Sequence, residues 1–210
     1  MKTLIVRVAV LGALLSPLAA RAQWETYRPR QSMSIFNYEM SMPVGSFKDN
    51  YIKDTSWRGF SFENRSMINE RFSAGFAFGY NRYEQTYDLL TLDRPNGGVI
   101  SGPVYRYTDQ LAVKALVHAY FLDGPLRPYV GVGLGGVWSY AYAQSADFAQ
   151  VNDGFHFIAS PELGLTFTAA RGASSLGLNL AFRYNYTTAS YAKVTDASNV
   201  AVVVGLFGAY

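Results

Sequence analysis

The chain has 210 residues, the length of one domain, and it contains no cysteine. Half of its residues (50%) are hydrophobic and only 16% are charged, against about 25% in soluble domains, which excludes a disordered chain. Lys2, Arg7 and Arg21 carry the net charge of +3, so the rest is formally neutral and offers no basic surface for nucleic acid.

The N-terminus has the pattern of a secretion signal. Lys2 and Arg7 form a basic region, residues 8–20 are mostly apolar, and Ala20-Arg21-Ala22 is an A-x-A cleavage site. An uncleaved anchor helix is the alternative, but the apolar stretch is shorter than the ~20 residues that span a bilayer. We therefore predict that residues 1–22 are a signal peptide removed after Ala22, and that residues 23–210 form one exported domain.

Beyond the signal, apolar residues alternate with polar or small ones, which is the period of a β-strand. The segment 99–107 keeps the odd-position parity of the strand that follows, so we interpret 99–121 as one long strand rather than two. The charge-free run 128–146 has alternating glycines and aromatics, which favours a strand over a membrane helix. In chain order, the eight alternating segments lie at 36–42, 60–63, 72–81, 99–121, 130–134, 157–168, 176–186 and 200–210.

The connections between these segments alternate in length. Short turns lie at 68–71, 122–126 and 170–173, and long polar loops lie at about 43–55, 85–98, 145–153 and 189–197. This alternation is the plan of an outer-membrane barrel, although a soluble β-sandwich would also have one apolar face per strand. No charged residue falls at mid-strand on the apolar face, which favours the membrane. We therefore predict an all-β, eight-stranded antiparallel transmembrane up-and-down β-barrel.

Aromatic residues gather near the ends of the predicted strands. Tyrosine and tryptophan suit the boundary between membrane and water, because one end of each side chain is apolar and the other is polar. We predict an aromatic girdle of Trp57, Tyr80, Tyr105, Trp138, Tyr140 and Tyr184.

The signal, the eight alternating segments and the closing run Val-Val-Val-Gly-Leu-Phe-Gly-Ala-Tyr resemble the small outer-membrane barrels of the OmpA/OmpX/OmpW type. The resemblance covers about residues 32–210. It implies a bacterial outer-membrane location, and it implies that periplasmic chaperones and the barrel-assembly machinery handle the chain, with Tyr210, Leu206 and Val204 as the assembly signal. Gly208 departs from the family pattern, in which a bulkier apolar residue is usual. Lipid and lipopolysaccharide are the implied partners at the outer rim, where Arg82 and Lys53 face outward.

If the apolar positions face lipid, the charged groups of opposite parity face the lumen. Eight strands enclose a space that side chains fill, so these charges must pair or be hydrated. We expect an internal ion-pair network that plugs the barrel, and the alternative is a pore in which Arg–Glu partners switch. Small inward residues leave room for water or for Tyr129, Tyr120 or Phe207. The expected polar network consists of Glu39, Glu63, Arg65, Lys114, His118, His156, Glu162 and Arg183.

Sites for cofactors, metals and catalysis are not expected. Gly131-Val-Gly-Leu-Gly-Gly136 matches G-x-G-x-x-G, but a strand-like segment follows it where a dinucleotide site needs a helix. His156, Ser160 and Glu162 share a face of one strand but are separated by ~7 Å for every two positions, too far for a proton relay. The scattered acidic loop residues form no calcium loop.

The sequence thus favours a non-enzymatic outer-membrane protein with an envelope or surface-contact role through its long loops. The first alternative is a narrow channel, or transport of small hydrophobic molecules as in OmpW-like relatives. The second is a lipid A-modifying enzyme. Leu89, Leu90 and Leu92 in the second long loop are expected to cover the barrel mouth.

Overall fold

The computed structural model describes residues 32–93, 97–145, 148–169, 175–191 and 194–210. The predicted signal peptide, its cleavage site and the predicted turn at 170–173 lie outside these residues, so these predictions stand as predictions. Among the described residues, no helix is long and apolar enough to cross a membrane.

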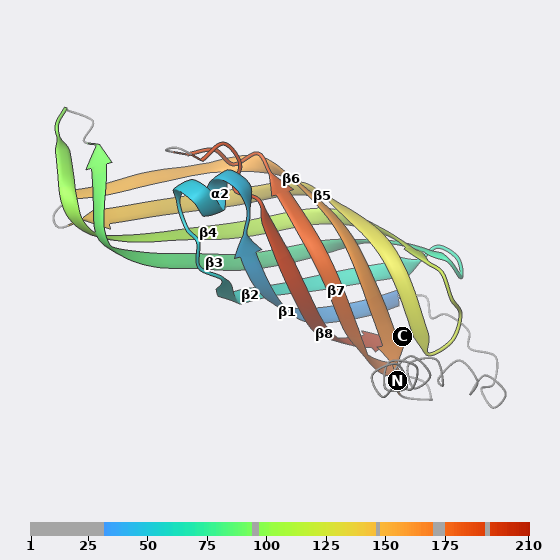
Figure 1. The fold of residues 1–210 in the computed structure, drawn as a ribbon. Helices are drawn as coiled ribbons and strands as arrows, with labels where there is room; N and C mark the ends of the chain where they lie inside the picture. Colours follow the sequence, from blue (N-terminus) through green and yellow to red (C-terminus); the bar gives the residue numbers. More distant parts are fainter. Residues whose placement is uncertain (1–31, 94–96, 146–147, 170–174, 192–193) are drawn as a thin grey trace, which may run out of the picture.

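The described residues form one closed antiparallel barrel of eight strands, as the alternation predicts. Each strand pairs with its neighbours in the chain, and the last strand pairs with the first to close the ring (Figure 1). The strands are β1 (Ser32–Pro43), β2 (Ser56–Met67), β3 (Phe72–Asp93), β4 (Val99–Tyr120), β5 (Leu126–Ser145), β6 (Phe148–Thr168), β7 (Ser175–Thr187) and β8 (Asn199–Ala209), with a short helix α2 (Gly45–Asn50) after β1.

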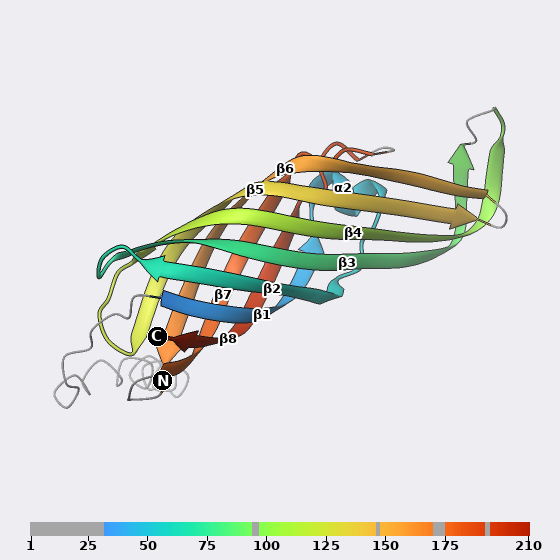
Figure 2. The same cartoon turned by 180° about the vertical axis from the view of Figure 1, so that it is seen from behind.

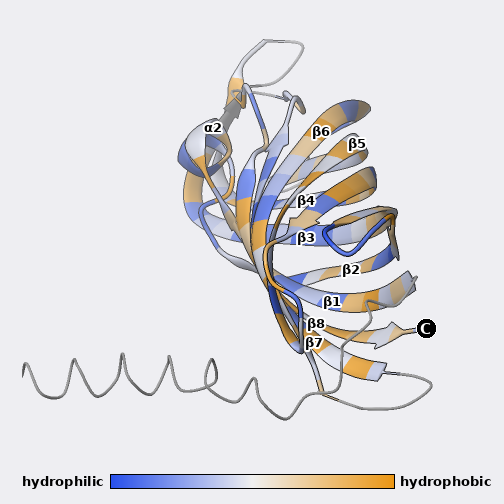
Figure 3. Ribbon diagram, turned by 90° about the vertical axis from the view of Figure 1, so that its right-hand side faces the viewer, coloured by the Kyte–Doolittle hydropathy of each residue, from blue (hydrophilic) through white to orange (hydrophobic). Residues whose placement is uncertain are grey.

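The side chains of the barrel wall alternate strictly between lumen and exterior. Along β7, every second residue is buried and every other one is exposed. Leu163 and Phe182, for example, are 62% and 51% exposed on the outside, whereas Arg183 is buried inside. Figure 3 shows the same alternation of hydrophobic and hydrophilic residues along the strands. A soluble sandwich would bury its apolar faces, so this wall, apolar outside and polar inside, is that of a transmembrane barrel.

Four of the eight strands are much longer than a membrane span requires. β3 to β6 have 22, 22, 20 and 21 residues, whereas β1, β2, β7 and β8 have 11 to 13. A transmembrane strand needs about 9–11 residues. The upper parts of β3–β6 therefore extend past the barrel as a four-stranded sheet, which we call the projecting sheet (Figure 2).

The projecting sheet confirms one prediction and corrects another. The prediction of a single long strand over 99–121 is confirmed by β4. The long polar loops expected at 85–98 and 145–153 are wrong in large part, because these residues continue the strands up to the pairs Asp93–Val99 and Ser145–Phe148. Pairing satisfies the backbone groups that face a neighbouring strand, and the alternation of aromatic, β-branched and polar residues suits a sheet exposed to water.

The connections at the other end of the barrel are short. The residues between β2 and β3 and between β4 and β5 form tight turns, and the C-terminus lies at this end (Figures 1 and 2). Ser32 and Tyr210 exchange backbone hydrogen bonds of 3.1 and 3.0 Å there, which fixes both ends of the barrel sequence.

A separate apolar cluster covers the lumen at the end with the projecting sheet. The segment after β1 contributes Phe47, Tyr51 and Ile52, and the segment before β8 contributes Tyr191 and its neighbours. The rings of Tyr51 and Tyr191 lie 5.1 Å apart, in an edge-to-face arrangement. We call this cluster the cap; its members are Phe47, Tyr51, Ile52, Ala189, Tyr191, Val194 and Ala197, packed on Tyr83 and Ala141 of the wall.

Polar contacts hold the cap to the barrel. Arg106 of β4 donates hydrogen bonds to the carbonyls of Asn50 and Tyr51, at 3.0 and 3.2 Å, where a cation stabilises the end of α2. The Ser46 hydroxyl accepts from the Thr195 backbone N–H at 3.0 Å, which joins the two cap segments. The expectation that Leu89 covers the mouth is wrong, because Leu89 is 76% exposed on β3.

Electrostatics in the cap follow from burial. Burial raises the pKa of the Tyr51 phenol to about 12, although the Arg106 guanidinium acts in the opposite direction. Burial also lowers the pKa of Arg106, whose guanidinium carbon lies 4.7 Å from the centre of the Tyr51 ring. The surroundings of Tyr51 in the cap therefore favour the neutral form of its phenol.

Candidate functional site

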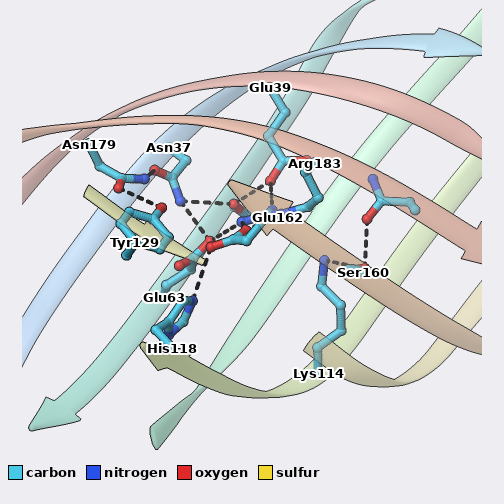
Figure 4. A network of polar contacts seen from close by, with 12 residues as sticks. Asn37, Glu39, Glu63, Lys114, His118, Tyr129, Ser160, Glu162, Asn179 and Arg183 are labelled. Carbon is cyan, nitrogen blue, oxygen red and sulfur yellow. Dashed lines mark hydrogen bonds and ion pairs between the residues drawn. The ribbon is translucent and has the colours of Figure 1, made fainter. Parts of the chain in front are cut away.

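Arg183 is the centre of a buried ion cluster in the lumen (Figure 4). Its Nε donates to Glu162 Oε2 at 2.7 Å, its Nη1 to Glu39 Oε1 at 2.7 Å, and its Nη2 to Glu63 Oε1 at 2.6 Å. These carboxylates come from β6, β1 and β2, which the closed barrel brings together from opposite ends of the chain. One guanidinium thus joins three strands across the lumen.

Arg65 completes the cluster on the side of the short turns. It donates from Nε and Nη2 to Glu63 Oε2 at 2.9 and 2.6 Å, and from Nη2 to Glu162 Oε1 at 3.1 Å. Its guanidinium also lies over the Tyr129 ring, 4.7 Å from the centroid. We call Glu39, Glu63, Arg65, Glu162 and Arg183 the ion cluster; their side chains are at most 4% exposed.

Neutral side chains satisfy the remaining acceptors around the ion cluster. The Ser61 hydroxyl donates to Glu39 Oε1, and Asn81 Nδ2 donates to Glu39 Oε2 at 3.4 Å. Asn37 Nδ2 donates to Glu63 Oε1 at 3.0 Å. Every carboxylate oxygen of the cluster therefore accepts at least one hydrogen bond, the condition under which a buried network is stable.

Lys114 and His118 lie beside the ion cluster, as their parity predicts, but His156 does not. Lys114 Nζ donates to Ser160 Oγ at 3.2 Å, and His118 Nε2 lies 3.0 Å from Glu162 Oε1. His156 is only partly buried and pairs opposite Val137, beyond the last β6–β7 pair. Its assignment to the network is therefore wrong, because parity gives the face of a strand but not the height along it.

A small polar cavity separates the ion cluster from the cap. Its volume is about 20 Å³, which holds one or two water molecules. Lys114 lines it together with Glu39 and several amides, so the cavity offers polar partners to a water molecule. The lining residues are Glu39, Gly79, Asn81, Gln110, Ala112, Lys114, Val137, Ile158, Asn185 and Asn199.

Aromatic rings fill the lumen below the ion cluster by packing on glycines of neighbouring strands. A Cβ added at Gly164 would lie 2.2 Å from Cζ of Tyr129, and one added at Gly177 would lie 2.2 Å from Cζ of Phe207. Tyr129 and Phe207 thus occupy space that glycine leaves, as the sequence suggests for inward glycines in general.

The structure assembles a hydroxyl, an imidazole and a carboxylate that the sequence does not reveal. Ser73 Oγ lies 3.3 Å from His118 Nδ1, and His118 Nε2 contacts Glu162, the connectivity of a catalytic relay. Ser73 is fully buried, however, and the cavity described above does not reach it. The relay therefore lacks room for a substrate. Serine is common at lumen-facing positions, so the sequence alone does not identify Ser73 as a site residue.

In the same region, three of the described residues have ligand atoms close enough together to bind one metal ion. Ligand atoms of Glu63, His118 and Glu162 lie within 4.8 Å of one another. Arg65 and Arg183 already neutralise both carboxylates, so a divalent cation would add net positive charge to a buried site. The donor set does not fit a metal.

The outward-facing predicted residues lie on the lipid side of the wall. Trp57, Tyr105, Trp138 and Tyr184 are exposed, whereas Tyr80 and Tyr140 are partly exposed. Of the assembly signal, Val204, Leu206 and Tyr210 point outward, and no atom lies within 4 Å of a Cβ added at Gly208. At the rim, Arg82 pairs with Glu84 at 2.5 Å and Asp109 at 3.5 Å, and Lys53 is exposed.

No family model and no curated protein matches the chain. Its fold is similar to that of Ail, the attachment invasion locus protein of Yersinia pestis, solved with the heparin analogue sucrose octasulfate. The TM-score is 0.53 at 14% identity, over 87% of this chain and 100% of Ail. The fold is also similar to that of Neisserial surface protein A, with a TM-score of 0.52 at 14% identity, over 85% of this chain and 96% of that protein. The chain therefore has the eight-stranded β-barrel fold of these small outer-membrane proteins.

Proposed function

We propose that this chain is a non-enzymatic integral protein of the bacterial outer membrane that contacts other molecules through its projecting sheet. The observation that carries this proposal is the contrast between a closed lumen and an extended outer surface. The lumen is blocked at two levels, by the cap and by the ion cluster. Four strands, by contrast, continue past the barrel at the end remote from the C-terminus.

The double closure argues against a passage for solutes. The cavity between the two barriers has room for one or two waters, and below it Arg65 and Arg183 bridge carboxylates of β1, β2 and β6 across the lumen. Separating a buried pair of charges costs about 3–5 kcal/mol, which makes spontaneous opening rare. The relay of Ser73, His118 and Glu162 is sealed in the same region, which argues against a lipid-modifying enzyme.

The projecting sheet offers a surface suited to recognition. Its outer face carries a ladder of tyrosines, in which Tyr107 lies 6.0 Å from Tyr140 and 5.0 Å from Tyr142, measured between ring centroids. Tyrosine and tryptophan supply large, rigid contact areas at protein interfaces. Lipid and lipopolysaccharide are the proposed partners of the aromatic girdle, which shares Tyr140 with this ladder.

A narrow channel is the second candidate, and Lys114 favours it. Its ammonium group contacts the Ser160 hydroxyl and faces the cavity, so it is the charge best placed to meet an ion if the ion cluster rearranged.

Single-channel conductance separates the two candidates. Residues 23–210 are refolded into a planar bilayer, with heat-modifiable gel migration as the control for folding. We expect no conductance from the folded protein. Discrete, reproducible current steps would refute the closed lumen and establish the channel.

A further inference from the structure

Arg106 is a buried cation that pairs with no carboxylate in the described part of the chain. It is 9% exposed, and its donated hydrogen bonds go to the backbone carbonyls of Asn50 and Tyr51, which are neutral. The buried arginines of the ion cluster, Arg65 and Arg183, each pair with two or more carboxylates. Because a buried charge is costly without a partner of opposite sign, Arg106 differs from them in a way that needs an explanation.

Two tyrosine rings frame the Arg106 guanidinium. Its central carbon lies 4.7 Å from the centroid of the Tyr51 ring and 5.4 Å from that of the Tyr87 ring. The face of an aromatic ring attracts a cation but carries no net charge. The rings therefore hold the guanidinium in place without neutralising it.

One edge of the guanidinium is left for a ligand. Both donated bonds come from Nη1, whereas Nε is buried and has no partner among the described residues. Buried donors in folded proteins are normally satisfied. Nε and the neighbouring Nη form a fixed fork, and such a fork matches two oxygens of one phosphate or carboxylate group.

Acidic residues around the cap do not supply this group. Asp49 and Asp54 are exposed, and Asp54 raises the pKa of the Tyr87 phenol without forming an ion pair with Arg106. The Asp196 carboxylate instead accepts hydrogen bonds from Ser46 Oγ at 3.3 Å and Thr195 Oγ1 at 3.2 Å. The counter-charge of Arg106 is therefore not found among these acids.

We propose that Arg106 binds a small soluble oxyanion beneath the cap, on the guanidinium edge that carries Nε. Phosphate is the model for this ligand, since it offers two oxygens to the fork and a negative charge to the cation. The inference goes beyond the proposed function and does not depend on it, because the site lies under the cap and not on the outer face of the projecting sheet.

A lipid headgroup matches this position less well than a soluble anion. Tyr105 and Tyr107, which flank Arg106 on β4, lie on the outer face of the strand, and their rings contact each other there. Arg106 has the opposite parity, so the wall of the sheet separates its guanidinium from the lipid side. The ligand therefore reaches Arg106 from the water side, at the margin of the cap.

The test measures hydrogen exchange of residues 45–52 in the full barrel, held in uncharged maltoside micelles that contain no phosphate. The Kd for inorganic phosphate is first measured by calorimetry in the same micelles. A ligand that binds only the closed cap slows its opening by a factor of 1 + [L]/Kd. At about ten times its Kd, phosphate should therefore slow exchange about tenfold, relative to chloride at the same ionic strength.

Three variants assign the effect to Arg106. Arg106→Gln should abolish the response to phosphate. Arg106→Lys keeps the charge but not the fork, and it should lose most of the response. Arg82→Gln is the matched control and should respond like the parent, because Arg82 faces outward and already pairs with Glu84. Heat-modifiable migration checks the folding of each variant, and Arg106→Lys decides the comparison if Arg106→Gln does not fold.

The outcomes that overturn the proposal are distinct. Equal slowing in the parent and in the Arg106 variants would show a general salt effect. Failure of the folded parent to bind phosphate would remove the site altogether. Slowing by phosphatidylglycerol added to the micelles, with no effect of free phosphate, would assign the site to a lipid headgroup and refute a soluble ligand.

Discussion

Replacing Arg183 by leucine tests whether the ion cluster is a dry structural element. The substitution removes every guanidinium contact of Glu39 and leaves Glu63 and Glu162 to share Arg65. Breaking one buried pair costs about 3–5 kcal/mol, because the remaining charge is left without compensation. Arg183 serves three carboxylates at 2.6–2.7 Å, so we expect a loss at the upper end, about 5 kcal/mol.

The assay is equilibrium unfolding by urea in phospholipid vesicles, followed by tryptophan fluorescence. Arg58→Leu is the matched control, because Arg58 also contacts a glutamate, Glu84, at 2.7 Å, but its side chain is 66% exposed. An exposed pair contributes less than about 1 kcal/mol. If Arg183→Leu lowers the free energy of unfolding no more than Arg58→Leu, the cluster is hydrated and the argument for a closed lumen fails.

Three further predictions concern packing and the cap. Gly164→Ala should cost about 1–3 kcal/mol in the same urea assay, since its Cβ would meet the Tyr129 ring, whereas Gly208→Ala, with open space around it, should be neutral; equal effects would contradict the packing. Tyr51 should ionise near pH 12, seen as the difference in phenolate absorbance between the parent and Tyr51→Phe. Folding raises this pKa, so neutral Tyr51 stabilises the folded cap by roughly 2–3 kcal/mol relative to its ionised form. This stabilisation is complete below pH 10 and is lost as the pH rises toward 12. An absorbance difference that titrates at pH 10 would show that the cap is open. Phe47→Ala should increase hydrogen exchange in α2 without producing conductance, because the ion cluster still closes the lumen; channel activity in this variant would refute the second barrier.

The sequence predicts the barrel because alternation is a local property that the fold preserves. The parity of Glu63 and Arg183 is enough to place both in the lumen, and the same parity rule identifies β4 as one strand. Height along a strand is not encoded in parity, so the parity of His156 predicts a place in a network that this residue does not reach. The contact of Arg183 with Glu39 depends on strand order around the closed ring, which no local pattern contains.

The cap and the projecting sheet show a second limit of sequence analysis. Phe47 and Ile52 are apolar residues within a polar connection, and this was the available signal for the cap. Their partner Tyr191 lies more than a hundred positions away, so the contact follows from the meeting of β1 and β8. Polar composition at 85–98 favours a loop, but water-exposed hairpins are equally polar. Composition alone therefore does not separate the two.

The origin of the cluster charges has a consequence for assembly. The carboxylates come from β1, β2 and β6 and the guanidinium groups from β2 and β7, so Glu39 of β1 gains its guanidinium partner only when the first and last strands meet. In an open sheet, Glu162 would still face Arg183 across β6 and β7, and Glu63 would still pair with Arg65 on β2, but Glu39 would have no guanidinium partner in a low-dielectric setting. Such an intermediate is unfavourable in lipid, which makes insertion of a half-formed barrel self-limiting. The cluster thus couples entry into the membrane to closure of the barrel.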